Sequence, residues 1–239
     1  MLNKAVKFYA VTAAFACGAV MASSTSMAAL ISASVGGVPV GASVYENFDN
    51  LAAAGGLSAS GITVSFSGTG AGTATLPDAP GQYAAPFISG SNGTPFGDPQ
   101  ANGPDVTQYL TTGIGQVTLQ LADYNQYFGL LWGSVDDYNT LSFYSGNTLL
   151  FNFTGLNVDS MANGNQGADG TLYVNINSDT PFNKVIASST GYAFEFDNVA
   201  LAIDPIRLPE IGVVPEPGTL ALLGLGLLAG MATRLRRTA

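Results

Sequence analysis

The chain has 239 residues, of which 47% are hydrophobic and only 10% are charged, and its formal net charge is −9. It has no histidine and one cysteine, Cys17, which excludes histidine-dependent triads and the usual zinc sites and, once the segment around Cys17 is removed, disulfides and cysteine nucleophiles. All 16 acidic residues lie between Glu46 and Glu216, where Lys184 and Arg207 are the only cations, so this stretch carries −14. A surface this negative disfavours nucleic acid and anionic lipid as partners.

The first 28 residues have the pattern of a secretory signal peptide. Two lysines precede an apolar run over residues 8–22, and Ser26 and Ala28 provide the small residues that signal peptidase needs before its cleavage site. We expect cleavage after Ala28 or Ala29. The alternative is a buried helix or a retained membrane anchor, which the shortness of the apolar run disfavours.

Between the two ends, about 180 residues remain, enough for one domain with a hydrophobic core. Short runs of β-branched and aromatic residues are separated by Gly, Asn, Asp and Ser, without a helical period. Some alternate: Ile62, Val64 and Phe66 share one face, and so do Tyr192, Phe194 and Phe196, so that one face should pack and the other should meet solvent. Ten such runs predict an antiparallel β-sandwich, jelly-roll-like in form. The predicted strands are residues 43–49, 61–67, 115–121, 127–132, 140–144, 148–153, 172–177, 184–188, 192–197 and 199–203.

Two segments have the composition of long loops. Residues 69–105 are rich in Gly, Pro, Ala and Asn and should form a long ordered loop or flap with room for one short strand, and residues 159–170 should form a second loop. Ser145, Gly146 and Asn147 predict a tight hairpin between two of the strands.

Acidic residues near both ends of this body suggest a calcium site. The first and last strands of a jelly roll commonly lie side by side, which would bring Glu46 and Asp49 close to Asp197 as oxygen ligands for Ca²⁺. The alternative is that these carboxylates are the solvent-facing half of alternating strands, with Asp197 and Asn198 in a turn.

The only tryptophan begins a stretch with the chemistry of a sugar site. Trp132 would provide an aromatic face, and Asp136, Tyr138 and Asn139 would provide polar groups for hydroxyls. The alternative, which we favour, is that Trp132 continues an apolar run into the core and that residues 136–139 form an ordinary turn.

A glycosidase would need a pair of carboxylates as acid and base, and the candidates are Asp136 with Asp137 or Glu195 with Asp197. Residues two apart on a strand share a face, whereas adjacent residues do not. Neither spacing is diagnostic, and we expect no enzymatic activity.

The C-terminal segment combines a short motif, an apolar run and a basic end. Residues 218–233 carry no charge, and as a helix rising ~1.5 Å per residue they would span about 24 Å, slightly less than a ~30 Å hydrocarbon core. The cations beyond the run predict a cytoplasmic end, with the acidic body outside. The motif is Val214, Pro215, Glu216 and Pro217, and the basic end carries Arg234, Arg236 and Arg237.

This arrangement resembles the PEP-CTERM sorting signal of Gram-negative bacteria. In that family a membrane-embedded protease, exosortase, recognises the motif and releases the protein towards the cell surface or the exopolysaccharide matrix. The resemblance implies processing by signal peptidase and exosortase, with an intermediate anchored in the inner membrane. The alternative is an ordinary anchor, in which Pro215 and Pro217 only end the preceding strand and start the helix.

The body also resembles a class of exosortase-dependent surface proteins of cyanobacteria and proteobacteria. The resemblance covers residues 45–203, and its most specific parts are the stretches WGSVD at 132–136 and FEFDN at 194–198, with NGNQ at 163–166. It implies location and fold, because that class has no established molecular activity.

We therefore expect a signal peptide (1–28), a β-sandwich domain (29–207), a linker with the motif (208–217), a transmembrane helix (218–233) and a basic cytoplasmic tail (234–239). The predicted function is a structural or adhesive role at the cell surface or in the exopolysaccharide matrix, with Ca²⁺ as the candidate cofactor and polysaccharide as the candidate partner. The alternatives are a carbohydrate-binding module and, after it, a carbohydrate-active enzyme.

Overall fold

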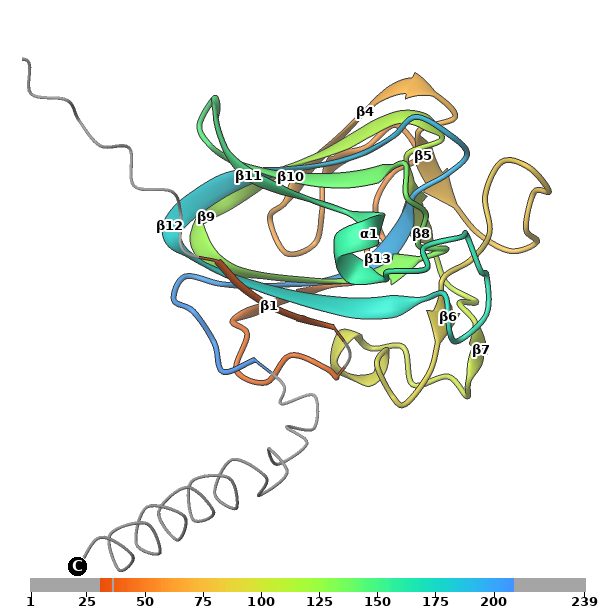
Figure 1. Cartoon of the computed structure of the whole chain (residues 1–239), viewed down its shortest axis with the longest axis horizontal. Coiled ribbons are helices and arrows are strands. Elements are labelled where there is room, and N and C mark those ends of the chain that lie inside the picture. The colour runs from red at the N-terminus through yellow and green to blue at the C-terminus, as the bar shows by residue number, and fades with distance from the viewer. Residues whose placement is uncertain (1–30, 36, 209–239) are drawn as a thin grey trace, which may run out of the picture.

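The computed structural model describes residues 31–35 and 37–208, which form an all-β, antiparallel fold (Figure 1). This confirms the predicted fold class. The strands are β1 (Ile31–Val35), β2 (Val44–Glu46), β3 (Gly56–Leu57), β4 (Thr63–Thr69), β5 (Gly72–Ala74), β6 (Phe87–Ile88), β7 (Gly103–Pro104), β8 (Tyr109–Thr111), β9 (Ile114–Gly133), β10 (Asn139–Ser145), β11 (Thr148–Thr154), β12 (Leu172–Ser189) and β13 (Glu195–Ala202), with the short helices η1 (Thr94–Phe96) and α1 (Gly155–Val158).

Two long strands, β9 and β12, run through both layers of the sandwich. They are paired along most of their length, and the register shifts on either side of Phe182, where both strands turn from one layer into the other (Figure 1). Pro181 lies at this irregularity, because proline cannot donate a ladder hydrogen bond. The predicted separate strands 115–121 and 127–132 are therefore halves of β9, and 172–177 and 184–188 are halves of β12.

The two layers of Figure 1 follow from this pairing. The upper layer has the order β11, β10, C-terminal half of β12, N-terminal half of β9, β4 and β3. The lower layer has the order β1, N-terminal half of β12, C-terminal half of β9 and β13. β13 then pairs with β2 along its C-terminal half and with β8, which continues to β5, along its N-terminal half. The predicted hairpin at Gly146 joins β10 and β11.

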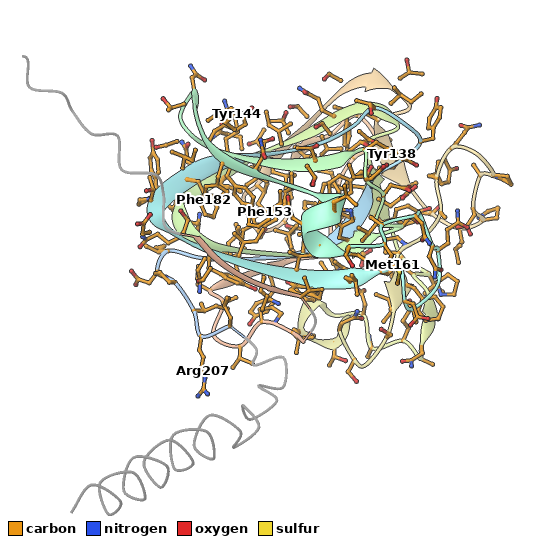
Figure 2. The ribbon with its side chains drawn as sticks, viewed as in Figure 1. Tyr138, Tyr144, Phe153, Met161, Phe182 and Arg207 are labelled. Carbon is orange, nitrogen blue, oxygen red and sulfur yellow. The ribbon has the colours of Figure 1, made fainter. Side chains whose placement is uncertain are left out.

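The main core lies between the layers and is rich in phenylalanine. Phe182 packs edge-on against Phe143 with ring centroids 5.0 Å apart, and Phe143 stacks on Phe151 at 4.6 Å. Figure 2 shows Phe182 and Phe153 in the space between the two layers. Aromatic burial on this scale is the main source of stability for a fold without disulfides.

The outer face of the lower layer is also covered. The segment between β5 and β8, predicted as a loop or flap, lies over it and packs Ile88 and Phe96 against Leu131 and Tyr173 (Figure 1). Every residue of β13 is buried as a consequence. The expectation that one face of residues 192–197 would meet solvent is therefore wrong, and the separate strands predicted at 192–197 and 199–203 are one strand that begins at Glu195.

The predicted signal peptide, with its expected cleavage site at Ala28 or Ala29, and the C-terminal motif with the predicted helix and tail lie outside the described residues. Within residues 31–35 and 37–208, no helix is long and apolar enough to cross a membrane.

Candidate functional site

Four loops form a polar pocket of about 190 Å³ at the end of the sandwich opposite the bend. The loops are those between β5 and β6, β9 and β10, α1 and β12, and β12 and β13. Figure 2 shows Tyr138 and Met161 at this end and Phe182 towards the other. The lining residues are Gly81, Gln82, Tyr83, Ser134, Asp136, Tyr138, Asn163, Gly164, Gln166, Tyr192, Ala193 and Glu195.

Asp136 and Tyr138 form the best-defined contact in the pocket. The Tyr138 hydroxyl lies 2.6 Å from Asp136 Oδ2 and 2.9 Å from the carbonyl oxygen of Tyr192, so it can donate its one proton to either. Burial raises the pKa of Asp136, while the bond from Tyr138 favours the charged form and the neighbouring Asp137 opposes it. The pair joins the β9–β10 loop to the connection before β13.

Glu195 forms the floor of the pocket and is 2% exposed. Its Oε1 accepts a hydrogen bond of 3.1 Å from the backbone N–H of Ala84, while Oε2 has no partner among the described residues. Burial raises the pKa of Glu195 to about 8; the bond from Ala84 and the nearby Ser134 hydroxyl oppose this shift, and the Asp136 charge adds to it. A pKa of about 8 favours the protonated form of Glu195 at pH 7, which can donate a hydrogen bond as well as accept one.

Gly164 is required for the shape of the pocket. Its φ of +69° lies in the left-handed region, and an added Cβ would stand 2.7 Å from Asp136 Oδ2. The backbone N–H of Gly164 donates to Val135 O at 3.0 Å, which holds the α1–β12 loop against the β9–β10 loop. Any side chain here would push against the carboxylate of Asp136.

The structure separates the four residues predicted for a sugar site. Asp136 and Tyr138 line the pocket, but Trp132 is 0% exposed and stacks on Phe194 in the core, with ring centroids 4.2 Å apart. Asn139 is also buried, accepting from the Ser189 hydroxyl and donating to the backbone of Ala193. The alternative interpretation of Trp132 as a core residue therefore agrees with the structure.

Sequence reasoning did not connect Glu195 with Asp136. Each belonged to a different candidate pair, and the structure places one member of each pair in the pocket. The tyrosines at 83 and 192 and the amides at 82, 163 and 166 were not singled out as site residues either. The two predicted loops could have pointed to all of these except Tyr192, which was predicted to lie in a strand.

The predicted calcium ligands are only partly brought together. β2 pairs with β13, and Glu46 lies opposite Val199. The first and last predicted strands of the body therefore lie side by side, as expected. However, the Glu46 carboxylate is occupied by the N–H of Phe48 and by the N–H and hydroxyl of Ser60, at 2.6 to 2.8 Å. Asp49 is exposed and Asp197 is buried, so these three residues do not form one oxygen cage.

We expect stability to fall as pH rises between about 4.5 and 8 because of Glu195. Its folded pKa of about 8 lies above the ordinary value of 4.5, so the folded state keeps a proton that the unfolded state releases. Replacing Glu195→Gln removes this titration. The free energy of unfolding of the variant, relative to that of the wild type, should therefore rise by about 1.4 kcal/mol for each pH unit between about 4.5 and 8. Above pH 8 this difference should stay constant. Urea denaturation from pH 5 to pH 9 measures the difference.

Glu46→Gln is the matched control, because the charge of Glu46 should change the stability of the fold with pH in the opposite direction. Burial alone would raise the pKa of Glu46, but the hydrogen bonds from Ser60, Ser58 and Phe48 outweigh it and lower the pKa. Its charge therefore stabilises the fold above the ordinary pKa, and this contribution is lost as pH falls through the lowered folded value. Glu46→Gln should destabilise the protein at pH 7. A pH-independent difference between Glu195→Gln and wild type would contradict the assignment of Glu195.

The fold and the pocket define an all-β sandwich protein with a polar pocket built by loops at one end. Residues 213–237 match the PEP-CTERM protein-sorting motif, which confirms the predicted sorting signal. The motif implies export, a membrane-anchored sorting intermediate and exosortase-dependent sorting to the cell surface. Neither the curated proteins nor the solved structures contain a significant match to the chain. The resemblance of residues 45–203 to a class of surface proteins stays a prediction.

Proposed function

We propose that this exported protein has an adhesive role at the cell surface or in the extracellular matrix, and that it holds polysaccharide through the polar pocket. The observation that supports this best is the composition of the lining, in which three tyrosines surround a floor with two carboxyl groups, Asp136 and Glu195. Saccharides bind between aromatic rings, which meet their C–H faces, and planar polar groups, which pair with their hydroxyls.

The size and charge of the pocket favour a small neutral unit. A volume of about 190 Å³ lies below the ~300–1,000 Å³ typical of pockets for drug-sized molecules, so it suits a single sugar ring of a longer chain. The amides of Gln82 and Gln166 are exposed at its edge and can pair with hydroxyls. Acidic sugars are disfavoured because no cation from the described part of the chain lines the pocket and the lining contains Asp136.

Binding without catalysis is part of the proposal. Asp136 and Glu195 could in principle act as a glycosidase pair, but Tyr138 holds Asp136 at 2.6 Å and Ala84 holds one oxygen of Glu195. The Asp136 carboxylate, which already accepts from Tyr138, suits a binding site better than a base that must take a proton from a substrate. Incubation with host polysaccharide should therefore release no oligosaccharide.

Calorimetric titration of the purified exported protein with oligosaccharides from its host's exopolysaccharide tests the proposal. Gln166→Ala removes an exposed lining amide, and Tyr138→Phe removes a lining hydroxyl while keeping the ring. Each should weaken binding about tenfold, the effect of losing one hydrogen bond of about 1.4 kcal/mol. Gly164→Ala should weaken it further, because its Cβ would displace Asp136.

Tyr144→Phe is the matched control for Tyr138→Phe, since Tyr144 lies outside the pocket (Figure 2). The Lys184 ammonium lies over the Tyr144 ring, 4.8 Å from its centroid. It should bind as well as the wild type. Equal binding by Gln166→Ala, Gly164→Ala and wild type would reject the pocket as the saccharide site. Release of shortened oligosaccharides that stops in Glu195→Gln would instead support an enzyme.

A further inference from the structure

β13 carries a second buried acidic residue beyond the pocket. Asp197 lies two residues after Glu195, so both side chains are on the outer face of the lower layer. The segment between β5 and β8 covers this face and brings two further carboxyl groups over the strand. Together they form the buried acidic cluster, which consists of Asp98, Asp105, Asp197 and Asn198.

Six buried polar atoms of this cluster have no hydrogen-bond partner among the described residues. They are both carboxylate oxygens of Asp197, both side-chain polar atoms of Asn198, and Oδ2 of Asp98 and of Asp105. Asp105, Asp197 and Asn198 are each 0% exposed. Because buried polar groups in folded proteins are nearly always paired, such a concentration in one place indicates a missing partner.

The charges that act most strongly on the cluster are negative. Burial, and after it the charges of Asp105, Asp98 and Asp49, raise the pKa of Asp197 well above its usual range, although the nearby backbone N–H of Asn198 partly opposes this. Burial and the charges of Asp105 and Asp49 raise the pKa of Asp98 to about 6, and the Asn198 amide, which lies nearby without the geometry of a hydrogen bond, partly opposes this. Buried like charges of this kind are stable only when they are protonated or when a cation lies among them.

The two cationic side chains within residues 31–35 and 37–208 are placed away from the cluster. Lys184 lies on the upper layer, beside Asn147 and the Tyr144 ring. The side chain of Arg207 is exposed and points away from the two layers (Figure 2). Oδ1 of Asp105 already accepts from the N–H and hydroxyl of Thr107, which leaves Oδ2 directed elsewhere.

The ligand chemistry selects calcium among the common cations. Ca²⁺ accepts six to eight oxygen ligands from carboxylates, amide carbonyls, backbone carbonyls and water, in flexible geometry. No group of three or more acidic side chains in the described part of the chain is arranged to hold a metal by itself. An ion in the cluster would therefore take its charge from two carboxylates and complete its shell with neutral oxygens.

We propose that the buried acidic cluster is a Ca²⁺ site, in which Asp105 and Asp197 provide the charged ligands, Asn198 provides a neutral one, and water or backbone carbonyls complete the shell. The ion would fasten residues 93–108 onto β13. This site is distinct from the pocket and from the predicted set of Glu46, Asp49 and Asp197, since Glu46 is already occupied. It does not depend on saccharide binding.

The experiment uses the exported protein purified from its host, freed of metal with EDTA and titrated calorimetrically with CaCl₂ and, separately, with MgCl₂. We expect one Ca²⁺ per chain, weaker binding of Mg²⁺, and a higher melting temperature in Ca²⁺ than in EDTA. Asp197→Asn keeps the shape of the side chain and removes its charge. The Asp197→Asn variant should bind Ca²⁺ at least about tenfold more weakly than the wild type. In EDTA, its melting temperature should be no lower than that of the wild type.

Asp105→Asn is the second variant and should behave in the same way, while Asp123→Asn removes an exposed carboxylate at the bend of β9 and is the matched control. A wild type that melts identically in Ca²⁺ and EDTA, without heat of binding, would show that the carboxyl groups are protonated instead and would overturn the proposal. Undiminished Ca²⁺ affinity in both cluster variants would overturn it as well, because the ion would then lie elsewhere.

Discussion

Replacing Glu216→Ala should leave the exported protein with its complete C-terminal segment. In the wild type we expect intact-mass analysis of protein from the envelope and medium to show loss of the segment that follows Pro217. The match at residues 213–237 supports this expectation, because recognition of the motif by exosortase precedes release. Glu216 is the one charged group within the motif, so its removal takes away the polar feature that a protease inside a membrane can recognise against an apolar helix.

Glu210→Ala is the matched control, because it removes an acidic residue from the same linker, six positions before Glu216. It should be processed like the wild type. In Glu216→Ala, the loss of processing is expected to be nearly complete, and the uncleaved protein should be found in the membrane fraction. A full-length C-terminal segment in the wild type and in both variants would contradict processing and leave an ordinary membrane anchor.

The second large effect is expected at Trp132, where Trp132→Ala should lower the free energy of unfolding by about 3–5 kcal/mol. The indole is 0% exposed and stacks on Phe194 at 4.2 Å, so alanine would leave a large cavity between the layers. Against a typical domain stability of about 5–15 kcal/mol, this loss is severe. Urea denaturation followed by far-ultraviolet circular dichroism measures it without relying on tryptophan fluorescence.

Trp132→Phe serves as the control, because it keeps a stacked ring and should cost less than alanine. The indole Nε1 has no partner among the described residues, so phenylalanine loses no hydrogen bond there. If Trp132 were instead a sugar platform, Trp132→Ala would lose oligosaccharide binding with unchanged stability. That outcome would contradict the core assignment.

β13 connects the two proposed sites. Glu195 lies under the pocket and Asp197 lies in the buried acidic cluster, on one face of the same strand and beneath the same covering segment. Two buried carboxyl groups in neighbouring positions are costly for a fold, and they are retained where they serve a ligand. The separate experiments distinguish a protonated acid at Glu195 from a cation at Asp197.

Much of the strand pattern was predictable, while the extent of the strands was not. Alternation marked both halves of β9 and of β12, but the bend between the halves looked like a loop because residues 122–126 and 178–183 are polar. Only pairing with a neighbour that bends at the same place keeps each strand continuous through the turn. The burial of Glu195 and Asp197 was missed for a related reason, since the covering segment is far away in sequence.

The sequence by itself determined the all-β class and the sorting signal, and it excluded histidine and thiol chemistry from the mature body. These properties depend on composition, on period-two alternation and on a contiguous motif, all of which are local. Only the tertiary structure decided that Asp136 meets Glu195, that Trp132 is core, and that Asp197 lies beneath Asp98 and Asp105. Such contacts join residues about 60 to 100 positions apart, and they depend on which loop crosses which face of the sheet, for which the periodicity of one segment carries no signal.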